Sequence, residues 1–135
     1  MAAVLLVEDV AILRMILRGF LESGGHGVTE CDGGKEASRL IGDNRFDAVV
    51  TDIFMKDGDG LTFIRDQRSN GVTIPIIAMT GGDPRAPQSE SGNLALRAGA
   101  DSVLTKPVTK SMILEAVKGS RAHRPPLGES SAPSR

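Results

Sequence analysis

Apolar and polar positions follow a regular order along the chain. Short runs, apolar throughout at residues 3–7 and mixed with polar residues in the others, are followed by longer stretches in which apolar residues recur every three or four positions. The first pattern is typical of strands buried on both faces, and the second of amphipathic helices. The apolar runs predict strands at residues 3–7, 28–31, 46–51, 74–80 and 102–105. The helical repeats predict helices around residues 12–21, 34–41, 61–64, 94–98 and 109–118. Strict alternation of strand and helix predicts one doubly wound α/β domain with a five-stranded parallel sheet.

Two of these helices carry more specific expectations. In the first, Ile12, Met15, Ile16 and Phe20 recur at helical spacing, so we expect this stripe, widened by Leu13, Leu17 and Leu21, to face the core. Residues 81–93 are rich in Gly, Pro and Ser and predict a loop, so the fourth helix should be short and should begin near residue 94.

The C-terminal residues differ in composition from the rest of the chain. Residues 1–120 carry the strand and helix pattern, whereas residues 121–135 are rich in Pro and Ser. A segment of this composition cannot bury enough apolar surface to fold. We therefore expect a single domain over residues 1–120 and a disordered tail over residues 121–135.

Composition narrows the possible functions. The 135 residues include 16 Lys and Arg against 17 Asp and Glu, which gives a net charge of -1 and argues against direct DNA binding. One cysteine fits a reducing compartment, and no apolar run is long enough to span a membrane. These features indicate a soluble, cytoplasmic protein without membrane insertion.

Charged and polar side chains come directly after the predicted strands. Glu8 and Asp9 follow the first strand, Asp52 the third, Thr80 the fourth and Lys106 the fifth. Parallel sheets bind ligands beyond the carboxyl ends of their strands, so these groups should lie close together. Crowded carboxylates either raise a pKa or recruit a cation, and oxygen ligands suit Mg²⁺. With a lysine and a hydroxyl nearby, Asp52 could act as the nucleophile that accepts a phosphoryl group.

This arrangement resembles the receiver domain of response regulators in bacterial two-component signalling. The resemblance covers residues 2–120 and implies the CheY-like, flavodoxin-like strand order 2-1-3-4-5. It implies that a histidine kinase or phosphotransfer protein phosphorylates Asp52, and that the chain is no enzyme beyond its own phosphorylation and dephosphorylation. The residues implied to bind Mg²⁺ are Glu8, Asp9, Asp52 and, through its backbone carbonyl, Phe54. Those implied to contact the phosphate are Thr80, Gly81 and Lys106. The peptide bond before Pro107 is implied to be cis.

Several positions depart from the family pattern. Val103 stands where receivers usually carry an aromatic residue, and Lys56 where they commonly carry proline. Phe54, two residues after Asp52, cannot position water by hydrogen bonding, so loss of the phosphoryl group should be slow. The first hypothesis is a stand-alone receiver that acts on an unknown output protein in trans, or as a phosphate relay or sink. A pseudo-receiver that binds partners without phosphorylation, and a flavodoxin-like cofactor protein, remain alternatives.

Overall fold

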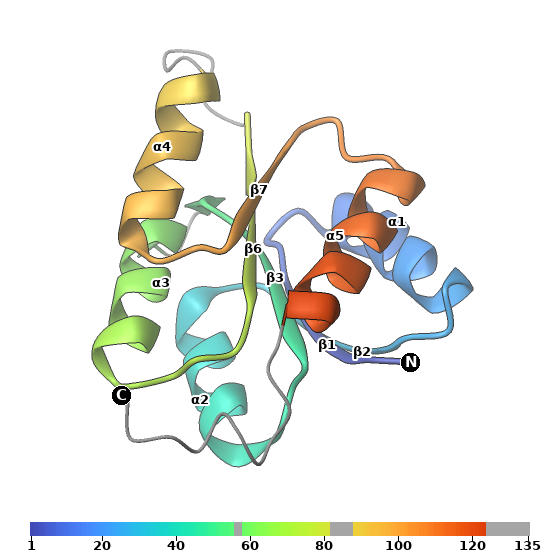
Figure 1. The fold of residues 1–135 in the computed structure, drawn as a ribbon, viewed down its shortest axis with the longest axis horizontal. Coiled ribbons are helices and arrows are strands. Elements are labelled where there is room, and N and C mark those ends of the chain that lie inside the picture. Colours follow the sequence, from blue (N-terminus) through green and yellow to red (C-terminus); the bar gives the residue numbers. More distant parts are fainter. Residues whose placement is uncertain (56–57, 82–87, 124–135) are drawn as a thin grey trace.

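The computed structural model describes residues 1–55, 58–81 and 88–123, and it is built around one parallel sheet (Figure 1). Its five strands are, in chain order, β1 (Ala3–Val7), β2 (Gly27–Cys31), β3 (Ala48–Asp52), β6 (Ile76–Thr80) and β7 (Ser102–Thr105). Neighbours in the sheet follow the order β2-β1-β3-β6-β7, and every pair is parallel. A separate hairpin of two-residue strands, β4 (Phe54–Met55) and β5 (Gly58–Asp59), takes up two of the strand numbers. The expected strand order 2-1-3-4-5 is therefore confirmed.

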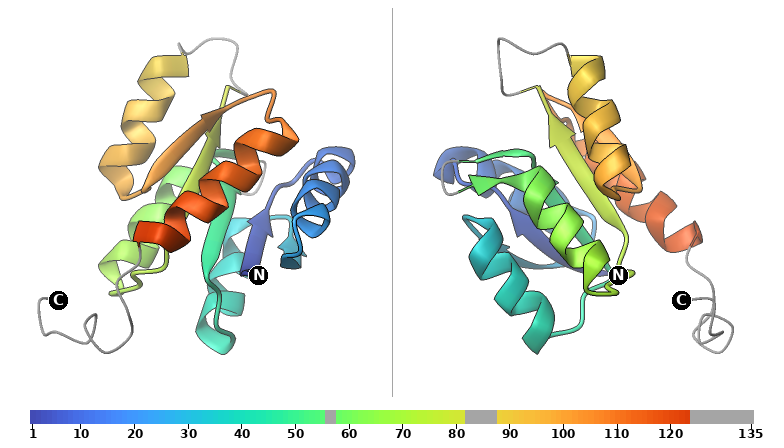
Figure 2. Two further views of the ribbon diagram at one scale, coloured as in Figure 1. Left: turned by 45° about the vertical axis from the view of Figure 1, so that its right-hand side comes forward. Right: turned by 90° about the vertical axis from the view of Figure 1, so that its left-hand side faces the viewer.

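Helices cover both faces of this sheet (Figure 2). α1 (Ala11–Ser23) and α5 (Lys110–His123) lie on one face, and α2 (Gly34–Asp43), α3 (Gly60–Ser69) and α4 (Gln88–Ala98) lie on the other. Alternate strand residues point to opposite faces, so Leu5 packs in the α2–α4 layer and Leu6 in the α1–α5 layer. The central strands β3 and β6 are buried throughout, which explains why each is apolar up to the polar residues at its carboxyl end.

The first helix buries only part of the stripe that was expected to face the core. Leu17 and Leu21 are fully buried against the sheet, whereas Ile12, Met15 and Ile16 are exposed. The expectation that these three face the core was wrong. α1 carries apolar residues around most of its circumference, so periodicity alone could not identify the face that packs. The structure leaves an apolar stripe of α1 in solvent.

Two helix boundaries also differ from expectation. α4 begins at Gln88, not near residue 94, and residues 82–87 are not described. Its buried positions are the small residues Ser91, Ala95 and Ala98, which give a weak hydrophobic signal, while Leu94 and Leu96 are exposed. α5 continues to His123, so the first three residues of the expected tail are helical. The rest of that tail, residues 124–135, lies outside the described residues.

Candidate functional site

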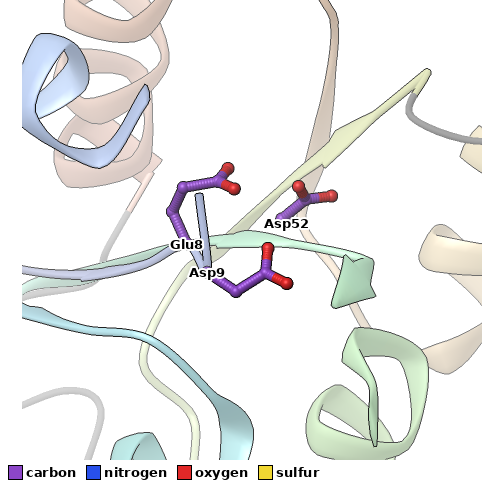
Figure 3. Close-up of side chains that lie close together, drawn as sticks. All are labelled: Glu8, Asp9 and Asp52. Atoms are coloured by element: carbon purple, nitrogen blue, oxygen red, sulfur yellow. The ribbon is translucent and has the colours of Figure 1, made fainter. Parts of the chain in front are cut away.

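Three carboxylates meet at the carboxyl ends of two neighbouring strands. Val7 and Thr51 are register partners in β1 and β3, so Glu8 and Asp52, one residue further along each strand, come side by side. Each of Glu8, Asp9 and Asp52 offers an oxygen within 4.8 Å of the others. Figure 3 shows the three side chains converging from the end of β1 and the end of β3. Glu8 and Asp52 are buried, and Asp9 is half-buried.

Asp52 is held by hydrogen bonds to both of its carboxylate oxygens. The backbone N–H of Phe54 donates to Oδ1 at 3.0 Å, and Lys106 Nζ donates to Oδ2 at 2.5 Å. Lys106 also contacts Glu8 Oε1 at 3.4 Å, while the N–H of Val10 donates to Glu8 Oε2 at 3.2 Å. One lysine therefore contacts two buried carboxylates that come from two different strands.

The negative charge at this site exceeds the positive charge. Burial raises the pKa of Glu8 to about 7, with the charge of Asp52 adding to the rise and Lys106 opposing it. Burial by itself would lower the pKa of Lys106, but its hydrogen bond to Asp52 and the charges of both carboxylates raise it. Lys106 is therefore a fixed positive charge at neutral pH, and a second cation would relieve the repulsion between Glu8 and Asp52.

Lys106 is placed by the end of the edge strand β7. Its backbone N–H donates to the carbonyl of Thr80 at 2.9 Å, and the Lys106–Pro107 peptide bond is cis. β7 lies two strands away from β3, so the side chain reaches across β6 to meet Asp52.

Thr80 ends β6, directly between the strands that carry Asp52 and Lys106. Met79 is the register partner of Asp52, and Thr80 that of Thr105. Thr80 Oγ1 is buried and has no hydrogen-bond partner among the residues that the structure describes. A buried hydroxyl of this kind is costly unless a ligand satisfies it. Gly81 follows with a φ of 104°, in the left-handed region that favours glycine.

Two further groups at this site were predicted from the sequence. The structure places the N–H of Phe54 on Asp52, but the role of the Phe54 carbonyl as a metal ligand stays a prediction, as does that of the Gly81 N–H. Val103 is half-buried and packs against the α2–α4 layer of the core, and a Cβ on Gly92 of α4 would lie 3.4 Å from it. Where receivers usually carry an aromatic residue, this chain has an aliphatic side chain close to α4.

Two residues support the site in ways that were not predicted from the sequence. Gly60 approaches Asp52 so closely that a Cβ would lie 2.3 Å from the Asp52 backbone carbonyl. Its sequence signal was only a glycine after a short turn. Arg14 of α1 donates to the backbone carbonyl of Glu8 at 2.7 Å. No sequence pattern would have paired a helix arginine with that carbonyl.

Comparison with protein families agrees with this geometry. A sequence model described as the response regulator receiver domain matches residues 4–118. The transcriptional regulatory protein PhoP of Escherichia coli K12 is 38% identical over 104 residues, which cover 77% of this chain and 45% of that protein. The virulence transcriptional regulatory protein PhoP of Salmonella typhimurium LT2 is 35% identical over 107 residues, 79% of this chain and 46% of that protein. The chain thus spans about half the length of these curated relatives.

Solved structures with the same fold include isolated receiver domains. The Francisella response regulator 1452 receiver domain has a TM-score of 0.81 at 26% identity and covers 90% of this chain and 98% of its own. The receiver domain of a sensor histidine kinase from Pseudomonas aeruginosa has a TM-score of 0.79 at 28% identity, with 90% and 98% covered. That structure holds a magnesium ion coordinated in the active site cleft.

In this chain, no helix among the described residues is long and apolar enough to cross a membrane.

Proposed function

Since the chain belongs to the response regulator receiver domain family, we propose that Asp52 accepts a phosphoryl group from a phosphohistidine in a Mg²⁺-dependent reaction. The donor is a histidine kinase or a phosphotransfer protein. The observation that carries this proposal is the contact between the buried carboxylate of Asp52 and Lys106, with two further carboxylates within 4.8 Å. A strand-ending aspartate without function would need neither the lysine nor the second and third acid.

The proposed chemistry is a displacement at phosphorus. An oxygen of Asp52 attacks the phosphorus of the phosphohistidine, the P–N bond breaks, and the imidazole leaves with the bonding electrons and takes up a proton. The product is an acyl phosphate on Asp52. Lys106 already lies 2.5 Å from Oδ2 and would balance the charge of the transferred oxygens, and the unpartnered Thr80 hydroxyl would donate to one of them. The chain itself turns over no external substrate in this scheme.

The acidic residues fit the magnesium ion that this chemistry uses. Three carboxylates with oxygens within 4.8 Å are hard ligands of the type that Mg²⁺ prefers, and among the residues that the structure describes Lys106 is the one cation paired with the two buried ones. Glu8, Asp9 and Asp52 would hold the ion, directly or through water. When bound, it would supply positive charge against the phosphoryl oxygens. The raised pKa of Glu8 in the metal-free protein supports the same assignment.

The exposed stripe of α1 is the surface on which we expect the donor to dock. Val10, Ile12, Met15 and Ile16 are 48%, 65%, 62% and 45% exposed, and the last three share one face of the helix. They begin one residue after Asp9, so a protein bound there would lie next to the acidic cluster. Clustered apolar side chains in solvent mark interaction sites, and a helical donor that presents its phosphohistidine would cover them.

The output of phosphorylation is proposed to pass through another protein surface. The relatives named above are transcriptional regulators about twice the length of the matched region. Whether this chain signals through an output protein in trans or acts as a relay or sink depends on partners that the site does not specify. Val103 offers no aromatic ring that could follow Thr80, so we expect Thr80 and its adjoining loop to carry the change.

Intact mass spectrometry tests the acceptor directly. The full chain is incubated with Mg²⁺ and a small-molecule phosphodonor, alongside Asp52→Asn and the control Asp66→Asn, which changes an exposed helix carboxylate. We expect one added phosphoryl group in the wild type and in the control, and none in Asp52→Asn. No adduct in the wild type, even with a phosphohistidine donor, would favour the pseudo-receiver. An adduct that survives in Asp52→Asn would overturn the assignment of Asp52.

A further inference from the structure

The turn that carries Glu8 and Asp9 is short and lies at the start of α1. Only three residues, 8–10, join β1 to α1, and the helix begins after Val10, which makes no side-chain cap hydrogen bond. The first turn of α1 contains no acidic residue. Within the turn, the N–H of Glu8 donates to the carbonyl of Cys31 at 3.1 Å, and the N–H of Val10 donates to the Glu8 side chain. These bonds leave the Glu8 carbonyl, which belongs to the peptide unit shared with Asp9, to be held by another group.

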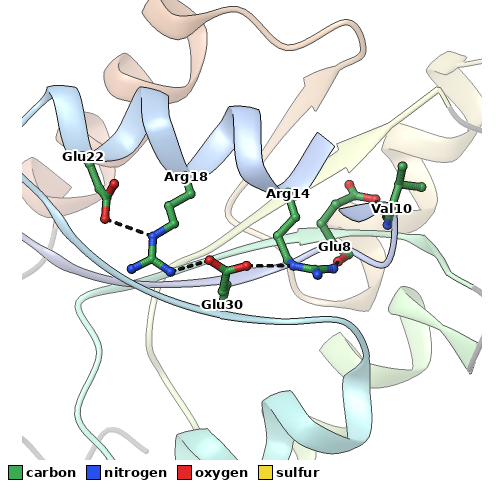
Figure 4. A network of polar contacts seen from close by, with 6 residues as sticks. All are labelled: Glu8, Val10, Arg14, Arg18, Glu22 and Glu30. Carbon is green, nitrogen blue, oxygen red and sulfur yellow. Dashed lines mark hydrogen bonds and ion pairs between the residues drawn. The ribbon is translucent and has the colours of Figure 1, made fainter. Parts of the chain in front are cut away.

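Arg14 holds that carbonyl. Its Nη1 donates to Glu8 O at 2.7 Å, while its Nε donates to Glu30 Oε1 on β2 at 2.9 Å. Figure 4 shows the guanidinium lying between the turn and the strand. Because the guanidinium is planar and its donors point in fixed directions, one side chain fixes the turn relative to the sheet.

Glu30 is itself fixed, so Arg14 is anchored on both sides. Arg18 also pairs with Glu30, and Glu22 pairs with Arg18 in turn. Hydrogen bonds from Arg18 and Arg14 lower the pKa of Glu30, which keeps it charged. The side chains of Arg14 and Glu30 are 20% and 32% exposed, so solvent competes only partly with their contact.

We infer that Arg14 is a positioning residue for the metal site: it holds the peptide between Glu8 and Asp9 so that both carboxylates can share a cation with Asp52. This inference rests on the proposed function. Arg14 donates hydrogen bonds to the Glu8 carbonyl and to Glu30, so its effect on a cation passes through the backbone of the turn.

The charge of Arg14 and its hydrogen bond to the turn predict opposite changes in Mg²⁺ affinity when Arg14 is replaced. A positive charge beside an acidic cluster repels a metal ion, so its removal alone would tighten Mg²⁺ binding. Loss of the hydrogen bond to the turn would weaken binding instead. Arg14→Lys keeps the charge but cannot form the forked contact to Glu8 and Glu30, so it separates the two effects further.

The experiment is a calorimetric Mg²⁺ titration of the full chain at constant ionic strength. The variants are Arg14→Gln and Arg14→Lys, with Arg18→Gln as the matched control, since Arg18 shares Glu30 but directs its other hydrogen bond to Glu22 and not to the turn. We expect the Mg²⁺ dissociation constant to rise roughly tenfold in both Arg14 variants, as for other outer-sphere partners of metal sites, and by less than about twofold in the control.

A structural readout accompanies the titration. Amide hydrogen exchange at Asp9 and Val10 should be faster in both Arg14 variants than in the wild type, and thermal unfolding in chelator reports whether each variant is folded. Unchanged or tighter Mg²⁺ binding in a folded Arg14→Lys variant overturns the inference and leaves the proposed function standing. Equal weakening in Arg18→Gln also overturns it. Absence of Mg²⁺ binding in the wild type contradicts the magnesium dependence of the proposed function and the inference with it.

Discussion

Gly60 and Asp52 are so close that no side chain fits between them: a Cβ on Gly60 would lie 2.3 Å from the Asp52 carbonyl and 2.6 Å from the Cα of Ile53. The N–H of Gly60 also donates to the carbonyl of Ile53 at 2.9 Å. The start of α3 therefore packs directly against the backbone of the proposed phosphoacceptor. Any side chain at position 60 has to displace β3 or α3.

We predict that Gly60→Ala destabilises the chain by about 1–3 kcal/mol, because the methyl group forces the backbones apart. It should also slow phosphorylation, since the displaced segment carries Asp52. The control is Gly42→Ala in α2, where a Cβ meets nothing within 4 Å and alanine favours the helix by up to about 1 kcal/mol. Urea unfolding measures both free energies. Equal stability of the two variants would contradict the close approach.

The metal-free protein should lose stability as pH rises from about 4.5 to 7. Glu8 titrates near 4.5 in the unfolded chain and near 7 in the folded one. Below both values it is neutral in both states and costs nothing. Above pH 7 its buried charge costs up to about 3 kcal/mol of unfolding free energy. Lys106 does not oppose this trend, because its raised pKa adds stability at every pH below 10.5.

Glu8→Gln removes this penalty. In chelator, the variant should gain stability over the wild type at pH 8 and gain little at pH 4.5. Urea unfolding at the two pH values measures the difference, and adding Mg²⁺ at pH 8 should reverse the advantage. A difference between variant and wild type that is the same at both pH values would show that burial of a charged Glu8 is not the cause.

Thr80 and Thr51 form a matched pair of buried hydroxyls. Thr51 Oγ1 donates to the Asp52 carbonyl at 2.9 Å, whereas Thr80 Oγ1 has no partner among the described residues. Thr80→Val should leave stability unchanged or slightly raised, and Thr51→Val should lower it by about 1 kcal/mol. Thr80→Val should nevertheless slow phosphoryl uptake, measured by intact mass over time. A loss of stability in Thr80→Val equal to that in Thr51→Val would reveal a partner for the Thr80 hydroxyl.

A substitution in the exposed stripe of α1 should slow phosphoryl transfer from a protein donor but not from a small-molecule donor. Met15→Lys changes a side chain that is 62% exposed, so folding should be affected by less than about 0.5 kcal/mol. Transfer from a phosphohistidine protein should fall, while phosphorylation by a small-molecule donor should be unchanged. Leu96→Lys on α4, which is 48% exposed, is the control. A donor that phosphorylates Met15→Lys as fast as wild type would exclude this face.

The sequence located the site better than it located the helices. Glu8, Asp52 and Lys106 could be placed because a parallel sheet brings the carboxyl ends of its strands to one edge, whatever lies between them. The buried face of α1 could not be predicted, since Ile16 and Leu17 are equally apolar and only contact with the sheet distinguishes them. α4 was placed late because Gly, Pro and Ser dominate residues 81–93, and because its buried positions Ser91 and Ala95 are small. Small buried residues leave little trace in a hydrophobic pattern.

The proposed acceptor and its lysine come from opposite halves of the chain, so they are synthesised at different times. Asp52 is translated well before Lys106, and the lysine reaches it only when β7 has paired with β6 along the edge of the sheet. A nascent chain whose last strand is still inside the ribosome contains the nucleophile without its counter-charge. On the proposed function, competence for phosphorylation would therefore arise only after β7 has joined the sheet.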